Sequence, residues 1–233
     1  MIRECQARVD YTYGYRRVGL WLNRQGVYAN HKRVYRLMEK YGLLAQIRRR
    51  RKFQQMSEFL HRYPNVLNRN FSARRPNEKW VTDISYIDTP QGTLYLSVIR
   101  DLFDSSIVAY KMGTQQSVNL VLQTLRQAKQ KETVAAELQL HSDQGFQYTS
   151  QAYFTLTQEY GIIPSMSRRG NCYDNAVAEN FFGILKSECL RRHKPQSLEH
   201  AKLLIDNFIF FYNNERIQLK TKLTPLEKRR QLL

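Results

Sequence analysis

Hydrophobic positions near the start of the chain recur with the spacing of two short helices. The first helix has an apolar face made of Tyr15, Val18 and Leu22, and Gly26 marks its expected end. Asn30 is a residue type that favours the N-cap position, so we expect a second helix to begin after it. The apolar face of that second helix consists of Val34, Leu37 and Met38. Two helices joined by a short turn are typical of a helix-turn-helix unit, although many helical hairpins do not contact DNA.

From Lys79 onwards the pattern changes to short apolar runs separated by turns and longer helical segments. Strands are predicted at residues 80–87, 94–99, 105–110, 138–141 and 162–163. Helical spacing occurs at residues 117–131, 150–160, 174–190 and 197–214. Three strands followed by helix, strand, helix, strand and helix is the element order of the ribonuclease H-like fold. The sequence therefore predicts an α/β fold with a five-stranded mixed sheet and flanking helices.

These patterns divide the chain into four segments. Residues 1–46 are predicted to be a small helical module that resembles a helix-turn-helix, and residues 47–78 a basic linker. Residues 79–190 are predicted to form the ribonuclease H-like core, and residues 191–233 its C-terminal helical extension.

The distribution of charge indicates a polyanionic partner. The chain has a formal net charge of +17, and residues 1–78 contain eighteen Lys and Arg against five Asp and Glu. Such an excess attracts nucleic acid or, more rarely, an anionic membrane surface. Candidate DNA contacts in this part of the chain are Lys32, Arg33, Arg36, Arg48, Arg49, Arg50, Arg51 and Lys52. The run at residues 48–52 fits a phosphate-tracking arm or a solvated linker, and the two interpretations are compatible.

Cysteine content and hydropathy indicate a reduced, aqueous setting. Cys5, Cys172 and Cys189 are odd in number and lack Cys-x-x-Cys spacing, which disfavours a disulfide framework or a thiolate zinc site. No apolar run approaches the length of a membrane helix, and the first residues do not resemble a signal peptide. We therefore expect a cytoplasmic protein without a membrane partner.

Three acidic residues are the main candidates for chemistry. Asp83 lies within the first predicted strand, Asp143 directly follows the fourth strand, and Glu179 lies on a later helix. Because the first and fourth strands are neighbours in this fold, the three carboxylates can converge. Carboxylate oxygens suit Mg²⁺, and a pair of such ions about 4 Å apart can stabilise both oxygens of an in-line phosphoryl transfer. The spacing of the three acids along the sequence is by itself weak support for such a site, since three acids at similar spacings occur often by chance.

The residues around these acids resemble a known family. The three segments are residues 80–86 around Asp83, residues 141–150 around Asp143, and residues 170–182 around Glu179. All three are similar to the integrase-core transposases of bacterial insertion sequences, whose catalytic acids are two aspartates and a glutamate. Thirty-five residues separate Asp143 from Glu179, which is the spacing characteristic of that family.

The resemblance extends over nearly the whole chain. Residues 13–17 and 30–38 resemble the helical module of insertion sequence family three, and residues 212–218 and 224–225 resemble its C-terminal signature. The departures from the family pattern are Asn180 and Gln218. In that family the transposase is encoded in two overlapping frames, and this chain resembles the second, OrfB. The resemblance implies that a frameshifted OrfAB fusion supplies a first-frame segment that recognises the inverted repeats.

The resemblance also implies a function and further site residues. It implies a bacterial transposase that uses Mg²⁺, or Mn²⁺ as a substitute, to cleave element ends and transfer a 3′-hydroxyl to another phosphodiester. The expected partners are double-stranded DNA at the inverted-repeat ends and at the target, the OrfA segment, and further copies of the chain on DNA, associated with the nucleoid. Further candidate DNA contacts are Lys186, Arg168, Arg169 and Arg216.

Several residues and the function itself keep more than one interpretation. His141 is expected to be structural rather than catalytic, and residues 165–173 are expected to form a loop over the site. Tyr212 fits a DNA contact or packing. The residues expected in the core include Phe208, Ile209, Phe210 and Phe211. The alternatives to a transposase are a non-catalytic DNA-binding regulator or decayed element remnant, and a ribonuclease H or general nuclease that shares the fold.

Overall fold

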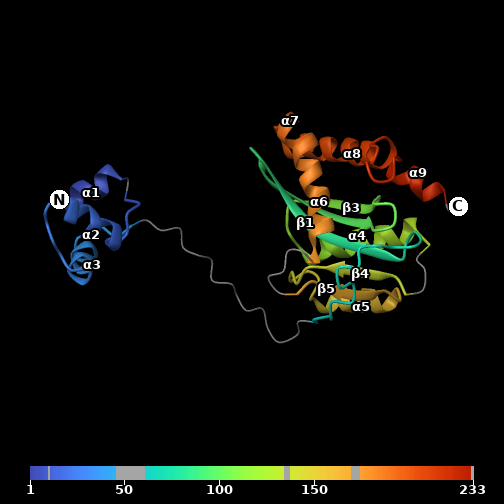
Figure 1. The fold of residues 1–233 in the computed structure, drawn as a ribbon, viewed down its shortest axis with the longest axis horizontal. Helices are drawn as coiled ribbons and strands as arrows, with labels where there is room; N and C mark the ends of the chain where they lie inside the picture. The colour runs from blue at the N-terminus through green and yellow to red at the C-terminus, as the bar shows by residue number, and fades with distance from the viewer. Residues whose placement is uncertain (10, 46–60, 134–136, 169–173, 232–233) are drawn as a thin grey trace. The chain divides into compact units, whose positions relative to one another are not determined.

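The computed structural model describes residues 1–9, 11–45, 61–133, 137–168 and 174–231. The chain divides into two compact units, Met1–Met56 and Ser57–Leu233, and each is considered by itself (Figure 1). The predicted DNA contacts Arg48, Arg49, Arg50, Arg51, Lys52 and Arg169 lie outside the described residues.

The described residues of the first unit contain three helices where the sequence predicted two. These are α1 (Ile2–Arg8), α2 (Tyr15–Arg24) and α3 (His31–Lys40). The buried side chains that they share are Cys5, Val18, Leu22, Val34, Met38 and Leu43. The additional helix α1 is tied to the unit by the buried Gln6, whose Nε2 donates to the carbonyls of Leu43 at 2.6 Å and Tyr13 at 2.9 Å.

The predicted end of α2 and the predicted start of α3 are confirmed. Helix α2 stops at Arg24, and Gly26 follows with φ of +77°, a conformation that glycine adopts at low cost. The side-chain oxygen of Asn30 accepts a hydrogen bond from the Lys32 amide at 2.9 Å, so Asn30 is the N-cap of α3.

The second unit is built on a five-stranded mixed sheet, as predicted. The strands are β1 (Lys79–Thr89), β2 (Gly92–Asp101), β3 (Ile107–Gly113), β4 (Gln139–Ser142) and β5 (Ile163–Met166). Their order in the sheet is β3-β2-β1-β4-β5. The first three strands form an antiparallel meander, whereas β4 pairs parallel to both β1 and β5. Strand β1 therefore joins the antiparallel and parallel halves of the sheet.

Helices cover both faces of this sheet (Figure 1). Helices α4 (Val118–Lys131) and α5 (Gln151–Glu159) bury one cluster of apolar residues, which includes Trp80 and Ile99. Helices α6 (Ala176–Leu185) and α8 (Leu198–Asn214) bury the other, which includes Ile87 and Val98. Because consecutive strand residues face opposite sides, neighbouring positions such as Val98 and Ile99 serve different clusters.

A π-helix and two short helices complete the second unit. The π-helix η2 (Lys186–Leu190) continues directly from α6 and leads into α7 (Arg191–His193). Helix α9 (Pro225–Arg230) begins with a capping box between Thr224 and Glu227. None of the described helices has the length and apolar character needed to span a membrane.

Four details of the sequence interpretation were wrong. Strand β3 begins at Ile107 rather than residue 105, and the predicted helix at residues 174–190 is α-helical only to Leu185. Residues 165 and 166 belong to β5 rather than to a loop. Phe208 and Ile209 are buried, but Phe210 and Phe211 are exposed. Four consecutive residues cannot all face one side of a helix that turns by 100° per residue, which explains the last error.

Candidate active site

The register of β1 and β4 brings two of the predicted acids to equivalent positions. Val81 pairs with His141 in the parallel ladder. Asp83 and Asp143 each follow their member of that pair by two residues, so both carboxylates point to the same side of the sheet at the same level. The chain crossover between the two strands thus places side by side two acids that are sixty positions apart in the sequence.

Asp83 is in an environment that opposes its ionisation. Burial, and then the nearby carboxylate of Asp143, raise the pKa of this carboxyl to about 7. Glu179 acts in the same direction, whereas the hydrogen bond from the Ile84 amide, at 2.8 Å, and the polar side chain of Asn175 act against it. Because it is costly to ionise both carboxylates at once, binding of a cation between or beside them would be favourable.

Asp143 is held by the turn that follows β4. Its Oδ1 accepts a hydrogen bond from the Gly145 amide at 2.9 Å, while burial raises the pKa of the carboxyl. A Cβ atom at position 145 would lie 2.9 Å from that same Oδ1 and 3.0 Å from Oε1 of Gln147. Glycine is therefore required at position 145 because the Asp143 carboxylate occupies the space that a side chain would need.

Glu179 lies in the first turn of α6, on the face of the sheet that carries Asp83. Helix α6 is fixed to the sheet by Arg100 on β2, whose Nη1 donates to the carbonyl of Val177 at 2.7 Å. The Glu179 side chain is exposed. Within the described ranges, no three His, Cys, Asp or Glu side chains are grouped to hold one metal ion. The close pair is therefore Asp83 and Asp143, with Glu179 beside it.

Two residues just before α6 had no role in the sequence interpretation. Asp174 is completely buried and forms ion pairs with Arg69 at 2.8 Å and Arg168 at 3.1 Å. Asn175 is also buried, and its side chain lies close enough to Asp83 to lower the pKa of that carboxyl. Both residues are in the segment around Glu179 that resembles the family motif, but their partners come from other parts of the fold, so no local pattern identifies their roles.

His141 is buried beneath the two aspartates and is fully hydrogen-bonded. Its Nδ1 lies 2.8 Å from Oγ of Ser165, and its Nε2 lies 3.0 Å from Oγ of Ser167. Burial lowers the pKa of the imidazole, which favours its neutral form. These contacts join β4 to β5 and its following residues, in agreement with the structural interpretation of His141.

The other predicted DNA contacts of this unit have protein partners. Lys186 lies with its Nζ 5.0 Å from the ring centroid of Tyr86, an exposed aromatic residue on β1. Arg216 forms two hydrogen bonds with the Glu188 carboxylate, at 2.6 and 2.8 Å. Arg168 pairs with Asp174 but leaves about half of its side chain exposed. Tyr212 is buried and donates to the carbonyl of residue 105, which is a packing role.

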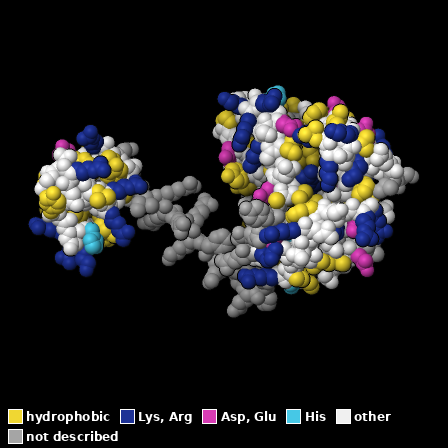
Figure 2. Space-filling view, viewed as in Figure 1, with side chains coloured by type: hydrophobic (Ala, Val, Ile, Leu, Met, Phe, Trp, Pro, Cys, Tyr) yellow, Lys and Arg dark blue, Asp and Glu magenta, His cyan; other side chains and the backbone are white. Residues whose placement is uncertain are grey.

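The predicted contacts of the first unit that the structure describes are exposed. Helix α3 buries Val34 and Met38 and presents its basic residues on the outside; these are Lys32, Arg33 and Arg36. In the view of Figure 2, Lys and Arg side chains are spread over the surface of this unit and acidic ones are scarce.

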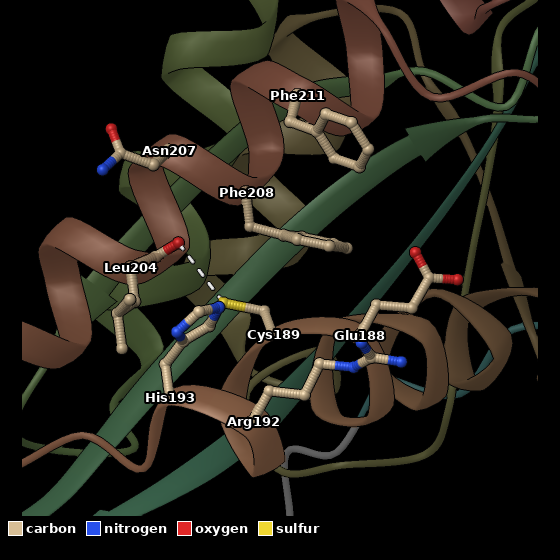
Figure 3. A pocket seen from close by; sticks show the side chains of 8 residues that line it. All are labelled: Glu188, Cys189, Arg192, His193, Leu204, Asn207, Phe208 and Phe211. Atoms are coloured by element: carbon tan, nitrogen blue, oxygen red, sulfur yellow. Dashed lines mark hydrogen bonds between the residues drawn. The ribbon is translucent and has the colours of Figure 1, made fainter.

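A surface groove lies apart from the carboxylates. It runs between α8 and the η2–α7 segment, and Figure 3 shows its lining residues. At its base, the Cys189 thiol donates to the carbonyl of Leu204 at 3.7 Å. The groove contains none of the three predicted catalytic acids, so it is not part of the candidate active site.

The sheet topology and its two adjacent aspartates define a ribonuclease H-like core of the integrase class. The catalytic core domain of HTLV-2 integrase, solved in complex with magnesium, superimposes with a TM-score of 0.54 over 66% of this chain and 97% of that core, at 17% sequence identity. At this level of identity the similarity establishes the fold.

Sequence comparisons establish the family. Profiles described as Integrase core domain match residues 73–172 and 179–233, and one described as HTH-like domain matches residues 1–51. The putative transposase InsK of insertion sequence element IS150 from Escherichia coli is 45% identical over 94% of this chain and 78% of its own length. The transposase InsF of insertion sequence IS3A from the same organism is 34% identical over 84% of this chain and 69% of its own length.

The chain belongs to the integrase-core transposases of bacterial insertion sequences. The resemblance to insertion sequence family three is confirmed, and so is the expectation of an enzyme of the polynucleotidyl transferase type.

Proposed function

We propose that this chain is the catalytic subunit of its insertion sequence, and that Asp83, Asp143 and Glu179 carry out DNA cleavage and strand transfer. In the proposed reaction, water cleaves a phosphodiester at the element end. The freed 3′-hydroxyl then attacks a second phosphodiester and displaces its 3′-oxygen. The observation that carries this proposal is the placement of Asp83, on β1, next to Asp143, which directly follows the adjacent parallel strand β4.

The donor atoms of this site fit Mg²⁺. Both aspartates offer hard oxygen ligands, and none of the ion pairs among the described residues neutralises them or Glu179. The side-chain oxygen of Asn175 is buried without a hydrogen-bond partner among the described residues, which adds a further unsatisfied oxygen to this region. When bound, Mg²⁺ would screen the phosphodiester charge and increase the nucleophilicity of the attacking oxygen.

Each carboxylate has a distinct contribution. Asp83, fixed on β1, and Asp143, fixed by the turn after β4, would each provide a ligand to the ion. Glu179, on the neighbouring helix α6, would provide a third. Lys186, seven residues beyond Glu179, would contact the phosphate backbone of the element end, with the Tyr86 ring limiting its side-chain freedom.

DNA recognition is proposed to involve the helix-turn-helix-like unit. Lys32, Arg33 and Arg36 would contact phosphates or bases from α3, and the basic run at residues 48–52 would follow the backbone. We further propose that an OrfA segment, joined as an OrfAB fusion, directs the enzyme to the inverted repeats, and that several copies assemble on paired ends.

A nicking assay on labelled element-end DNA, with the OrfAB fusion and Mg²⁺, tests the catalytic assignment. Asp83→Asn, Asp143→Asn and Glu179→Gln should each reduce the nicking rate at least about a thousandfold while DNA binding persists. Asp88→Asn is the matched control, because Asp88 is an exposed carboxylate on the same strand, and it should retain the wild-type rate. Wild-type rates in the three site variants would disprove the assignment.

The same assay separates the alternatives. A regulator or remnant would bind the ends tightly but produce no nicks with Mg²⁺ or Mn²⁺, even with the OrfA segment supplied. A ribonuclease H would cleave an RNA–DNA hybrid in preference to the element end. A transposase should cleave the element end in preference to both the hybrid and unrelated duplex.

A further inference from the structure

A buried carboxylate beside the candidate active site, that of Asp174, has no role in the proposed reaction. Hydrogen bonds from Arg168 hold the pKa of this carboxyl well below its usual range, and those from Arg69 act in the same direction. Asp174 is therefore a permanently charged group enclosed in protein, which is tolerated only where donors satisfy it.

The donors to Asp174 come from segments that are far apart in the chain. Asn65 donates from Nδ2 to Oδ2 at 2.9 Å, and Arg69 donates from Nε to Oδ1 at 2.8 Å. Arg168 donates to Oδ2 from its backbone amide and its Nε, both at 3.1 Å, and to Oδ1 from Nη2 at 3.4 Å. One carboxylate thus joins the segment before β1, the second residue after β5 and the start of α6.

The position of Asp174 relates it to the reacting groups. The next residue, Asn175, places its side chain close enough to Asp83 to lower the pKa of that carboxyl. The carbonyl of Asn175 accepts the first hydrogen bonds of α6, from the amides of Ala178 at 3.1 Å and Glu179 at 3.2 Å. A displacement of residue 174 would therefore move Asn175 and the first turn of α6 together.

We propose that Asp174 is a positioning residue for the active site. Its buried ion pairs fix the start of α6, which sets Asn175 against Asp83 and Glu179 at the side of the aspartate pair. The activity consequence rests on the proposed function; the structural consequence does not. Sub-ångström placement of catalytic groups strongly affects rate, so the effect on turnover should be large.

Amide hydrogen exchange of the full-length chain, followed residue by residue by NMR, tests this role independently of activity. Asp174→Asn keeps the shape of the side chain. It replaces one of the carboxylate oxygens that accept hydrogen bonds from Arg with an NH2 group, which is a donor. The amides of Ala178 and Glu179 should then exchange about tenfold to a hundredfold faster, since hydrogen bonds to charged groups hold that turn. The central-strand amides of Val81 and Ile99 should keep their wild-type rates.

A second variant changes Asn65, one of the residues that donate to Asp174. Asn65→Asp keeps the oxygen that accepts from the Asn68 amide but replaces the donor to Asp174 with a second carboxylate. It should accelerate exchange at the same two α6 amides. Asp104→Asn is the matched control, because Asp104 is also buried in an ion pair, with Arg229 at 2.8 Å, and it should leave those two amides unaffected.

The activity readout uses the nicking assay. Asp174→Asn should lower kcat at least about tenfold with little change in KM, because the misplaced groups act on the reacting bond rather than on DNA binding. Unchanged exchange at residues 178 and 179, or equal acceleration throughout the core, would overturn the proposal. If the wild-type chain does not nick DNA, the proposed function fails, while the exchange data still decide the role of Asp174.

Discussion

The central feature at the residue scale is a carboxyl group whose charge is unfavourable in the free protein. Asp83 is largely buried on a central strand beside a second carboxylate, and burial together with that neighbour raises its pKa to about 7. Folding therefore places an acid where its ionised form is costly, and a bound cation would remove much of that cost. Sites that sacrifice stability in this way are common where function requires concentrated charge.

Because ionised Asp83 is costly in the folded chain, Asp83→Asn should change the free energy of unfolding of the metal-free chain in a pH-dependent way. The unfolded carboxyl ionises near pH 4, whereas the folded one ionises near pH 7, so Asp83 lowers the free energy of unfolding as pH rises between these values. Above pH 7, Asp83→Asn should raise the free energy of unfolding by about 1–2 kcal/mol, after allowance for partial exposure. At pH 4 the two proteins should be nearly equal. Urea unfolding in EDTA at both pH values measures this, and a difference that does not depend on pH would contradict it.

A second residue-scale prediction concerns the space beside Asp143. In Gly145→Ala the new methyl group would lie 2.9 Å from Oδ1 of Asp143, so the carboxylate must move. The nicking rate should fall by about a hundredfold. The control is Gly183→Ala, since Gly183 is a helical glycine with open space around its Cβ direction, and its rate should stay near that of the wild type. A Gly145→Ala rate equal to that of this control would show that the carboxylate has room to adjust.

At the element scale, the short helix α9 is attached to the sheet by one buried cation. Arg229 pairs with Asp104 at 2.8 Å, Asp101 at 3.2 Å and Glu132 at 2.6 Å. These partners come from β2, the β2–β3 turn and the residue that follows α4. Helix α9 is too short to be stable alone, so its position depends on this network.

Removal of that cation should destabilise the whole second unit. Arg229→Met leaves Asp101 and Asp104 buried without a positive partner and should cost about 3–5 kcal/mol in the free energy of unfolding. Burial already raises the pKa of Asp101 to about 6, so the loss should be largest above that pH. Arg230→Met, one residue further and exposed, should change stability by less than about 0.5 kcal/mol. Equal unfolding midpoints for the two variants would contradict this.

At the scale of the whole molecule, the dominant property is a net charge of +17 concentrated in the first third of the chain. A small helical unit with exposed cations on α3 precedes a larger unit that contains the acidic site. Binding to the phosphate backbone through such cations releases condensed counterions, so affinity should depend steeply on salt.

A charge-removal experiment assigns part of this dependence to α3. The combined Lys32→Ala, Arg33→Ala and Arg36→Ala variant should reduce the slope of log K against log salt by about 2–3, near 0.9 for each lost phosphate contact. Fluorescence anisotropy with end DNA measures the slope. A triple variant in α4, Arg126→Ala, Lys129→Ala and Lys131→Ala, removes equal charge and should have a smaller effect. Identical slopes for the two triple variants would indicate a general charge effect.

The sequence by itself determined the order and type of most elements. Apolar alternation identified all five strands, and Asn30 and Gly26 identified helix ends, because these signals come from local backbone chemistry. The motifs around Asp83, Asp143 and Glu179 identified the family, since chemistry restricts those residue types strongly. The additional helices α1 and α9 were not predicted, because both are short and depend on contacts with distant residues.

Only the tertiary structure decided which groups meet. The parallel register of β1 and β4 sets Asp83 beside Asp143, and the long-range ion pairs of Asp174 set Asn175 at the same place. Periodicity records which face of an element is apolar, but strand register and buried ion pairs arise from packing between distant segments. For that reason the candidate catalytic acids could be named from the sequence, whereas the residues that hold them in place could not.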